Sequence, residues 1–183
     1  MRWLSLHRLS AQLLGHRIPI AIPVLALLVC MSALWALWPT TILEIRAGQD
    51  GQMVKMIPVT TGQWITYTYF HSVQKKPIDE MLEVAPNGHL VVRETVYEMT
   101  GAGLPSDVLD GDFKIDPKDG KFHIVNMSRD VPVFRVRVAF TAEQTLEVGA
   151  QKFRLDSLAT PMTLLVIDVV SRPRILTWHS TTS

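Results

Sequence analysis

The sequence predicts an all-β domain that follows one N-terminal apolar helix, and three observations support this fold class. Beyond Trp38, short runs of β-branched and aromatic residues alternate with Gly, Pro, Asn and Asp, which is typical of strands joined by turns. The segment 133–140, VFRVRVAF, alternates apolar and polar residues, as a strand with one buried face does. No long stretch beyond Trp38 has a helical period. About ten short strands with frequent turns are typical of an antiparallel β-sandwich or a partly closed barrel.

We expect the strands where an apolar or alternating run lies between turn residues. Turn chemistry marks GQDG at 48–51, APNG at 85–88, DPKDG at 116–120 and VGAQ at 148–151, because Gly, Pro, Asn and Asp accept the conformations that turns require. The expected strands are Ile42–Arg46, Val54–Val59, Trp64–His71, Met81–Val84, His89–Glu98, Lys121–Val125, Val133–Phe140, Thr145–Val148, Lys152–Leu155 and Thr163–Val170.

The first 38 residues have a different composition and predict a membrane anchor. Residues 18–38 run for 21 positions without a charge, and about 20 apolar residues cross a hydrocarbon layer of roughly 30 Å. The residues before them include three arginines and no acid, which places the N-terminus in the cytoplasm by the positive-inside rule. A cleaved signal peptide is the alternative, although its apolar core is normally shorter and ends at a small-x-small site.

These features divide the chain into four expected segments. The β domain must fold by hydrophobic burial without a disulfide, because Cys30 is the only cysteine and lies in the expected anchor. The sequence after residue 38 holds 15 basic and 17 acidic residues, a balance that gives no support for nucleic-acid binding. The segments are a cytoplasmic basic N-terminus (1–17), a transmembrane signal anchor (18–38), an extracytoplasmic β domain (39–175) and a C-terminal tail (176–183).

The turn APNG predicts the register of one hairpin. Proline presets a type I turn and glycine accepts the left-handed conformation that follows, which favours a three-residue loop at 86–88 with a bulge. Ala85 then pairs with His89, and counting back along both strands sets Glu80 opposite Glu94 on one apolar face. Like charges directly opposite destabilise a ladder unless a proton, a cation or water relieves them. A two- or four-residue loop would separate the pair.

His71, at the end of an expected strand, is the third candidate residue beside Glu80 and Glu94. The three side chains could form a structural hydrogen-bonded cluster, line a pocket for a polar ligand, or bind zinc or a harder divalent ion. Ser72 does not form a nucleophile pair with His71, because adjacent residues on a strand point to opposite faces. An envelope hydrolase that uses Ser72 is therefore the least favoured interpretation.

Three further polar segments are interpreted as turns or loops. Lys75 lies in a solvated turn that Pro77 helps to define. The segment TGAGLP at 100–105 is either an anion-binding nest or a tight turn, and a turn is favoured because the lysine and the spacing of a phosphate loop are missing. The acidic run at 107–119 lacks the spacing and the closing glutamate of an EF-hand, so we expect an exposed loop.

Three blocks of sequence occur in an order typical of one known family. They are YFHSVQKKPIDEM at 69–81, GHLVVRETVYEMTGAGLP at 88–105 and TLEVGAQKFRL at 145–155. Together they resemble domain-of-unknown-function family 1850, over about residues 42–170. Its members show a Y-x-H-S-V-x-K-x-P-x-x-E block, a strand ending in E-T, a G-A-G-x-P turn and an L-x-V-G segment. The matching motif positions are His71, Ser72, Lys75, Pro77, Glu80, Glu94, Gly101, Gly103 and Pro105.

The resemblance implies a role that the residues alone do not. The family has no established activity, and its genes commonly lie beside those of TAXI-type TRAP transporters, which take up organic anions. The resemblance therefore implies that this chain is a single-pass accessory protein of the bacterial inner membrane with a periplasmic domain. Its partners would be the transporter's membrane subunits or solute-binding protein. We expect no enzymatic activity and no cofactor; the alternative is a ligand- or metal-binding domain centred on His71, Glu80 and Glu94.

Overall fold

The computed structural model describes residues 20–72, 75–98, 110–140 and 143–180, and the side chains up to residue 177. Within the chain two compact units are distinguished, Met1–Ala36 and Leu37–Ser183. The first contributes most of the helix α1 (Ala21–Leu37), and the second is built almost entirely of strands.

The helix α1 is 17 residues long and apolar on all sides. Pro23 falls in its first turn, where a missing backbone N–H disturbs no hydrogen bond within the helix. Its large side chains are exposed, as Leu25, Leu28 and Leu34 illustrate. Among the described residues, no helix combines the length and the apolar character needed to cross a membrane.

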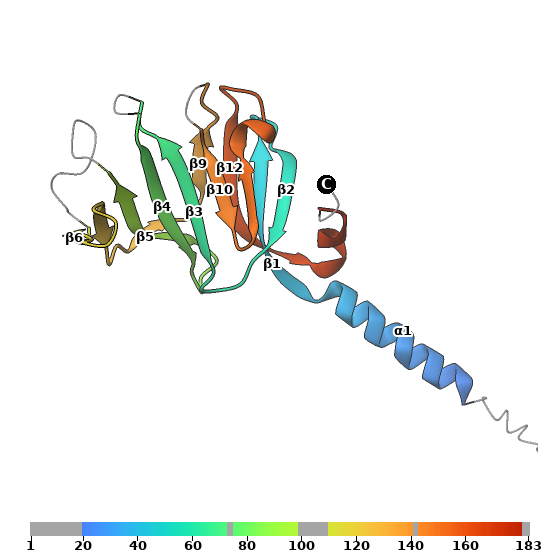
Figure 1. The fold of residues 1–183 in the computed structure, drawn as a ribbon. Helices are drawn as coiled ribbons and strands as arrows, with labels where there is room; N and C mark the ends of the chain where they lie inside the picture. Colours follow the sequence, from blue (N-terminus) through green and yellow to red (C-terminus); the bar gives the residue numbers. More distant parts are fainter. Residues whose placement is uncertain (1–19, 73–74, 99–109, 141–142, 181–183) are drawn as a thin grey trace, which may run out of the picture. The chain divides into compact units, whose positions relative to one another are not determined.

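Two antiparallel sheets make up the larger unit (Figure 1). The smaller sheet has the order β2-β1-β12-β9 and consists of β1 (Pro39–Ala47), β2 (Gln52–Pro58), β9 (Phe134–Arg137) and β12 (Leu164–Pro173). The larger sheet has the order β11-β10-β3-β4-β5-β7-β6, with β8 paired to β5. Its strands are β3 (Trp64–Phe70), β4 (Pro77–Val84), β5 (Leu90–Tyr97), β6 (Asp112–Ile115), β7 (Phe122–Val125), β8 (Arg129–Val131), β10 (Thr145–Val148) and β11 (Gln151–Arg154).

One hydrophobic core lies between the two sheets. Leu43 and Ile45 of β1 and Leu165 of β12 pack into the same buried cluster as Ile65 of β3 and Leu82 of β4. The cluster therefore takes alternate residues from strands of both sheets, as sandwich packing requires. The predicted fold class is confirmed at this level: the chain is mostly β, antiparallel and sandwich-like.

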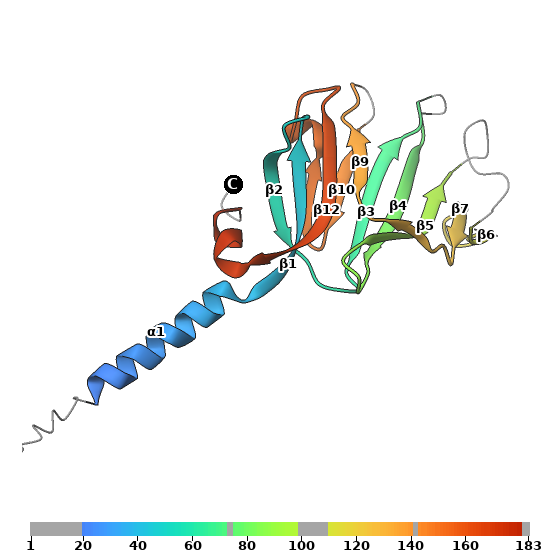
Figure 2. The same cartoon turned by 180° about the vertical axis from the view of Figure 1, so that it is seen from behind.

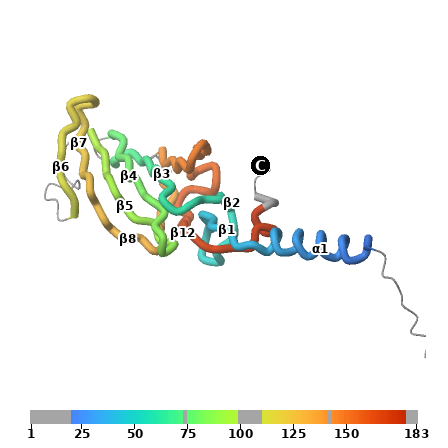
Figure 3. Tube along the Cα trace, turned by 90° about the horizontal axis from the view of Figure 1, so that it is seen from below, coloured from blue at the N-terminus to red at the C-terminus, as the bar shows by residue number. Residues whose placement is uncertain are grey.

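The chain passes from the larger sheet to the smaller one after β8. Val131 of β8 pairs with Leu90 of β5, whereas Phe134 of β9 pairs with Ile167 of β12. Figure 3 shows β8 alongside β5, and Figure 2 shows the smaller sheet from behind. Two residues, Pro132 and Val133, thus connect the sheets at this edge.

The C-terminal segment covers part of the smaller sheet. A 3-10 helix η2 (Arg174–Ser180) packs against β1, β2 and β12. Residues Ile42 to Ile45 of β1 are buried on both faces, including the side chain of Glu44. This 3-10 helix and the shorter η1 (Leu155–Ser157) were not among the predicted elements.

Several predicted strand bounds need correction. β4 begins at Pro77 instead of Met81, and a proline is tolerated there because it is the first strand residue. The acidic run expected as an exposed loop contains the strand β6, whose four residues are all exposed. β8 was also missed; it has three residues, too few to show an alternating pattern.

Candidate functional site

A β-bulge in the hairpin of β4 and β5 determines where the acidic candidates point. The predicted loop is correct: the Ala85 N–H donates to the His89 carbonyl over 2.9 Å. The next pairs, up to Leu82 opposite Val92, also have the predicted register. The register then shifts by one residue, and Arg93 is the extra residue in β5. Bulges of this kind redirect side chains and are common beside functional sites.

Because of this shift, Glu80 and Glu94 do not face each other. Glu80 lies opposite Thr95, and Glu94 lies opposite Met81. Glu80 shares the core face with Leu82, two residues away, whereas Glu94 is on the outer face. The predicted carboxylate pair is therefore wrong, and the extra residue Arg93 is the physical reason.

Glu80 is a half-buried acid on the inner face of the larger sheet. It lies opposite Tyr67 of β3, and its Oε1 is 3.8 Å from Nη2 of Arg129 on β8. Burial raises the pKa of Glu80, and the Arg129 charge opposes that shift. Burial also raises the pKa of Tyr69 on the same face. Arg129 therefore supplies a positive charge beside the Glu80 carboxylate.

Glu94 forms a hydrogen-bonded chain with His123 on the outer face. Its Oε1 is 2.6 Å from Nδ1 of His123, and Nε2 of His123 is 3.3 Å from Oδ2 of Asp119. The hydrogen bond with Glu94, followed by the contacts with Asp119, raises the pKa of His123. His123 comes from β7, where Val96 of β5 is its strand partner.

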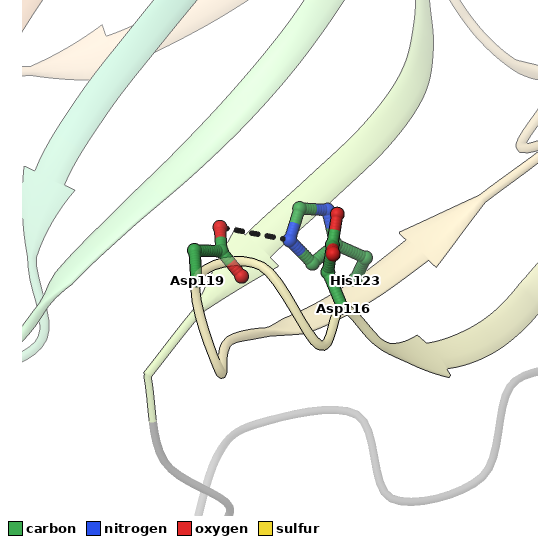
Figure 4. A group of neighbouring side chains, drawn as sticks. All are labelled: Asp116, Asp119 and His123. Carbon is green, nitrogen blue, oxygen red and sulfur yellow. Dashed lines mark hydrogen bonds and ion pairs between the residues drawn. The ribbon is translucent and has the colours of Figure 1, made fainter.

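The turn that joins β6 to β7 brings two aspartates to the same imidazole (Figure 4). Asp116 accepts the backbone N–H of Lys118, and Asp119 accepts that of Lys121, each over 2.9 Å. One carboxylate oxygen of each aspartate and one ring nitrogen of His123 all lie within 4.8 Å of one another. This is the one group of three or more potential metal ligands among the described residues.

Two neighbouring cavities share Glu94 and Val125. One has a volume of about 410 Å³ and is lined by Trp64, Arg93 and residues 125–128. The other, of about 360 Å³, is lined by Glu94, His123 and residues 114–117. The bulge thus places Glu94 at the boundary of two hollows on the outer face, within reach of solvent.

The remaining candidates of the first motif block lie in the turn after β3. His71 is half-buried, and its backbone N–H donates to the Lys76 carbonyl over 2.9 Å. Lys75 donates its N–H to the His71 carbonyl and has a φ of 54°. Ser72 is exposed in the same turn. Lys75 therefore lies in a turn, as predicted.

The three-residue centre of His71, Glu80 and Glu94 is not formed. These residues are all described, yet they are not a group with ligand atoms within 4.8 Å. The predicted backbone turn with Gly101, Gly103 and Pro105 lies outside the described residues.

Sequence reasoning missed the residues that do gather around Glu94. The strand Lys121–Val125 was predicted, and its alternation places His123 on the face opposite Ile124. That alternation was the available signal for His123. The segment DPKDG was interpreted only as a connection, and its two aspartates were assigned to a loop.

The fold and the site define a sandwich-like β domain with a carboxylate–histidine group on its outer face. A family model described as a domain of unknown function (DUF1850) matches residues 65–155. The match runs from β3 to the end of β11 and includes Glu80, Glu94 and His123. It confirms the resemblance over this shorter range. The chain has no significant match among curated proteins or among solved structures.

Proposed function

We propose that this protein is a membrane-tethered, non-enzymatic accessory protein of an organic-anion transporter of the TAXI-type TRAP class. The observation that best supports this proposal is that a segment without any charged residue, 18–38, precedes a β domain that has charged residues throughout. In this proposal the β domain lies outside the cytoplasm of a bacterial cell and contacts the transporter's membrane subunits or its solute-binding protein.

The tether is argued from the character of α1. A helix that is apolar on all sides needs apolar surroundings, either a protein core or a membrane, and its side chains are exposed. Its 17 residues are about 26 Å long at 1.5 Å per residue, against roughly 30 Å of hydrocarbon. The apolar sequence also continues before the helix, from Ile18 to Ile20.

The partner class is argued from the family. The matched range, 65–155, contains the motif positions His71, Lys75, Glu80 and Glu94, and the resemblance implies a transporter partner. A non-enzymatic role is favoured because Ser72, the candidate nucleophile, is exposed in a turn. An exposed serine in a turn is a poor candidate for a nucleophile, which works in a site that positions a base beside it.

Membrane fractionation tests the tether. The full chain, produced in a bacterium, should stay with the membranes after alkaline extraction, and external protease should digest its β domain. Replacing Leu27 and Leu28 by arginine should release it, because each charge at the centre of a span costs about 2.5–3.5 kcal/mol. Met53→Arg, on an exposed position of β2, is the control and should not. Recovery of the unaltered protein in the soluble fraction would overturn the tether.

Co-purification tests the partner. Tagged membrane subunits of a TAXI-type TRAP transporter from the same cell should retain the protein in mild detergent, and loss of the gene should reduce organic-anion uptake. If the protein fractionates with membranes but neither effect is seen, the tether stands and the transporter assignment is wrong.

A further inference from the structure

We propose that Asp116, Asp119 and His123 bind a divalent cation of the zinc type, with Glu94 as the residue that orients the histidine. This site shares only Glu94 with the predicted centre of His71, Glu80 and Glu94, and it does not depend on the tether or on a transporter partner. Its chemistry is that of two carboxylate oxygens and one imidazole nitrogen, a donor set that zinc accepts in proteins.

The two aspartates are held in place by the turn itself. The Asp116 N–H donates to the Lys121 carbonyl over 3.0 Å, and the Gly120 N–H donates to the Asp116 carbonyl over 2.8 Å. Each side chain also accepts a backbone N–H with one oxygen. Neither carboxylate can therefore swing away freely, and each retains lone pairs for a further ligand.

The histidine is oriented from behind by Glu94. Nδ1 of His123 is bound to Glu94, so Nε2 is the nitrogen directed at Asp119. A histidine that binds a metal through one nitrogen commonly donates the other ring N–H to a carboxylate, which fixes the tautomer and the ring direction. Only 15% of the His123 side chain is exposed, so the ring has little freedom to turn.

The three donor atoms need to move only a short distance toward one another to bind a single ion. They lie within 4.8 Å of one another, whereas ligands at 2.0–2.2 Å from a tetrahedral zinc ion are about 3.4 Å apart. Movement of the two aspartate side chains by about 1.4 Å or less, the difference between 4.8 and 3.4 Å, would bring the donors to that spacing. Three protein donors leave a fourth position for water or an external ligand, as in open zinc sites.

The charge around the site favours a cation. Glu94, Asp116 and Asp119 are negative, and Lys114 is the cationic residue that lines the same 360 Å³ cavity. Lys114 is opposite His123 in the ladder. Lys121 lies with its Nζ 3.9 Å from Glu98, and its charge also acts on Asp119. Three carboxylates still outnumber the two lysines, and a divalent ion would balance the excess.

Calorimetry with Zn²⁺ on the full chain in detergent, after removal of metals with EDTA, tests the site. We expect one ion per chain, with at least tenfold weaker binding in Asp119→Asn and in His123→Ala. Glu94→Gln should weaken binding by about 10–100-fold, as loss of an orienting carboxylate does. The matched control is His89→Ala, since His89 is another histidine paired with a carboxylate, Asp130, at 3.0 Å.

Two further measurements separate coordination from a structural role of these side chains. Co²⁺ should give visible absorption bands typical of coordination by nitrogen and oxygen, which His123→Ala removes and His89→Ala leaves. Thermal unfolding of the metal-free variants shows whether they are folded. Absence of 1:1 binding, equal losses in His89→Ala, or Ca²⁺ binding as tight as Zn²⁺ and unaffected by His123→Ala would overturn the proposal.

Discussion

Replacing Arg172 by methionine should destabilise the β domain, because it leaves a buried carboxylate without its charged partner. The Glu44 side chain is 1% exposed. It receives two hydrogen bonds from Arg172, at 2.7 Å from Nε and at 3.3 Å from Nη2. Glu44 also lies directly opposite Asp168 in the pairing of β1 with β12, and the Arg172 charge offsets part of the repulsion between these two carboxylates.

The magnitude follows from the burial of the two partners. Removing one partner of a fully buried ion pair costs about 3–5 kcal/mol. Arg172 is 45% exposed, so solvent screens part of the interaction, and we expect a loss of roughly 2–3 kcal/mol. For a protein of this size, 1 kcal/mol shifts Tm by about 2–4 °C, and the variant should melt roughly 4–12 °C lower. Methionine keeps the apolar stem of arginine, so little packing is lost.

A double-mutant cycle in chemical denaturation measures this effect. Glu44→Gln removes the charge that needs a partner, so Glu44→Gln with Arg172→Met should be more stable than Arg172→Met alone. Arg135→Met, at an exposed arginine in the neighbouring strand β9, is the control and should change the free energy of unfolding by less than about 0.5 kcal/mol. A loss of that small size at Arg172, or no recovery by Glu44→Gln, would refute the reasoning.

Three other perturbations have defined outcomes. Burial raises the pKa of Glu80, so its contribution to stability is present below the ordinary carboxyl pKa and is lost as pH rises through the raised value. Glu80→Gln should therefore raise Tm at pH 8, with a difference that shrinks toward pH 4; an equal difference at both would contradict this. Glu94→Gln should lower the pKa of His123 in the metal-free protein, measured by NMR titration, since that hydrogen bond is the main cause of the raised value; an unchanged pKa would contradict it. Gly111→Ala should cost about 1–3 kcal/mol, because its φ is 125° and an added Cβ would lie 2.6 Å from a backbone oxygen. Gly88→Ala, which meets open space, should cost less, and equal losses would argue against the steric reason.

Strands with one buried face could be predicted from the sequence, whereas an edge strand without buried residues could not. Thr145–Val148 was predicted with its observed bounds, because Leu146 and Val148 are buried and alternate with exposed or half-buried residues. In β9, Val136 is buried and Arg135 and Arg137 are exposed, as the alternation predicted. The edge strand β6 has no buried residue, so its sequence has no reason to alternate in polarity.

The hairpin loop was predictable because turn chemistry is local, whereas the bulge was not. Proline and glycine at 86 and 88 determine the loop through their own backbone preferences. Arg93 follows three buried residues, Leu90 to Val92, and a run that is buried throughout does not show where the pairing changes. A site assembled by counting residues along a strand therefore becomes wrong after one inserted residue, because every later side chain changes face.

The bulge also explains how two acids only fourteen positions apart are both accommodated. With the predicted register, Glu80 and Glu94 would meet on the inner face and repel each other. With the bulge, Thr95 takes the inner position, Glu80 lies 3.8 Å from Arg129, and Glu94 turns outward to His123. Each acid thus has a basic partner on its own face of the sheet. We infer that the two motif positions have separate roles, Glu80 within the inner face and Glu94 at the exposed group that we propose binds a cation.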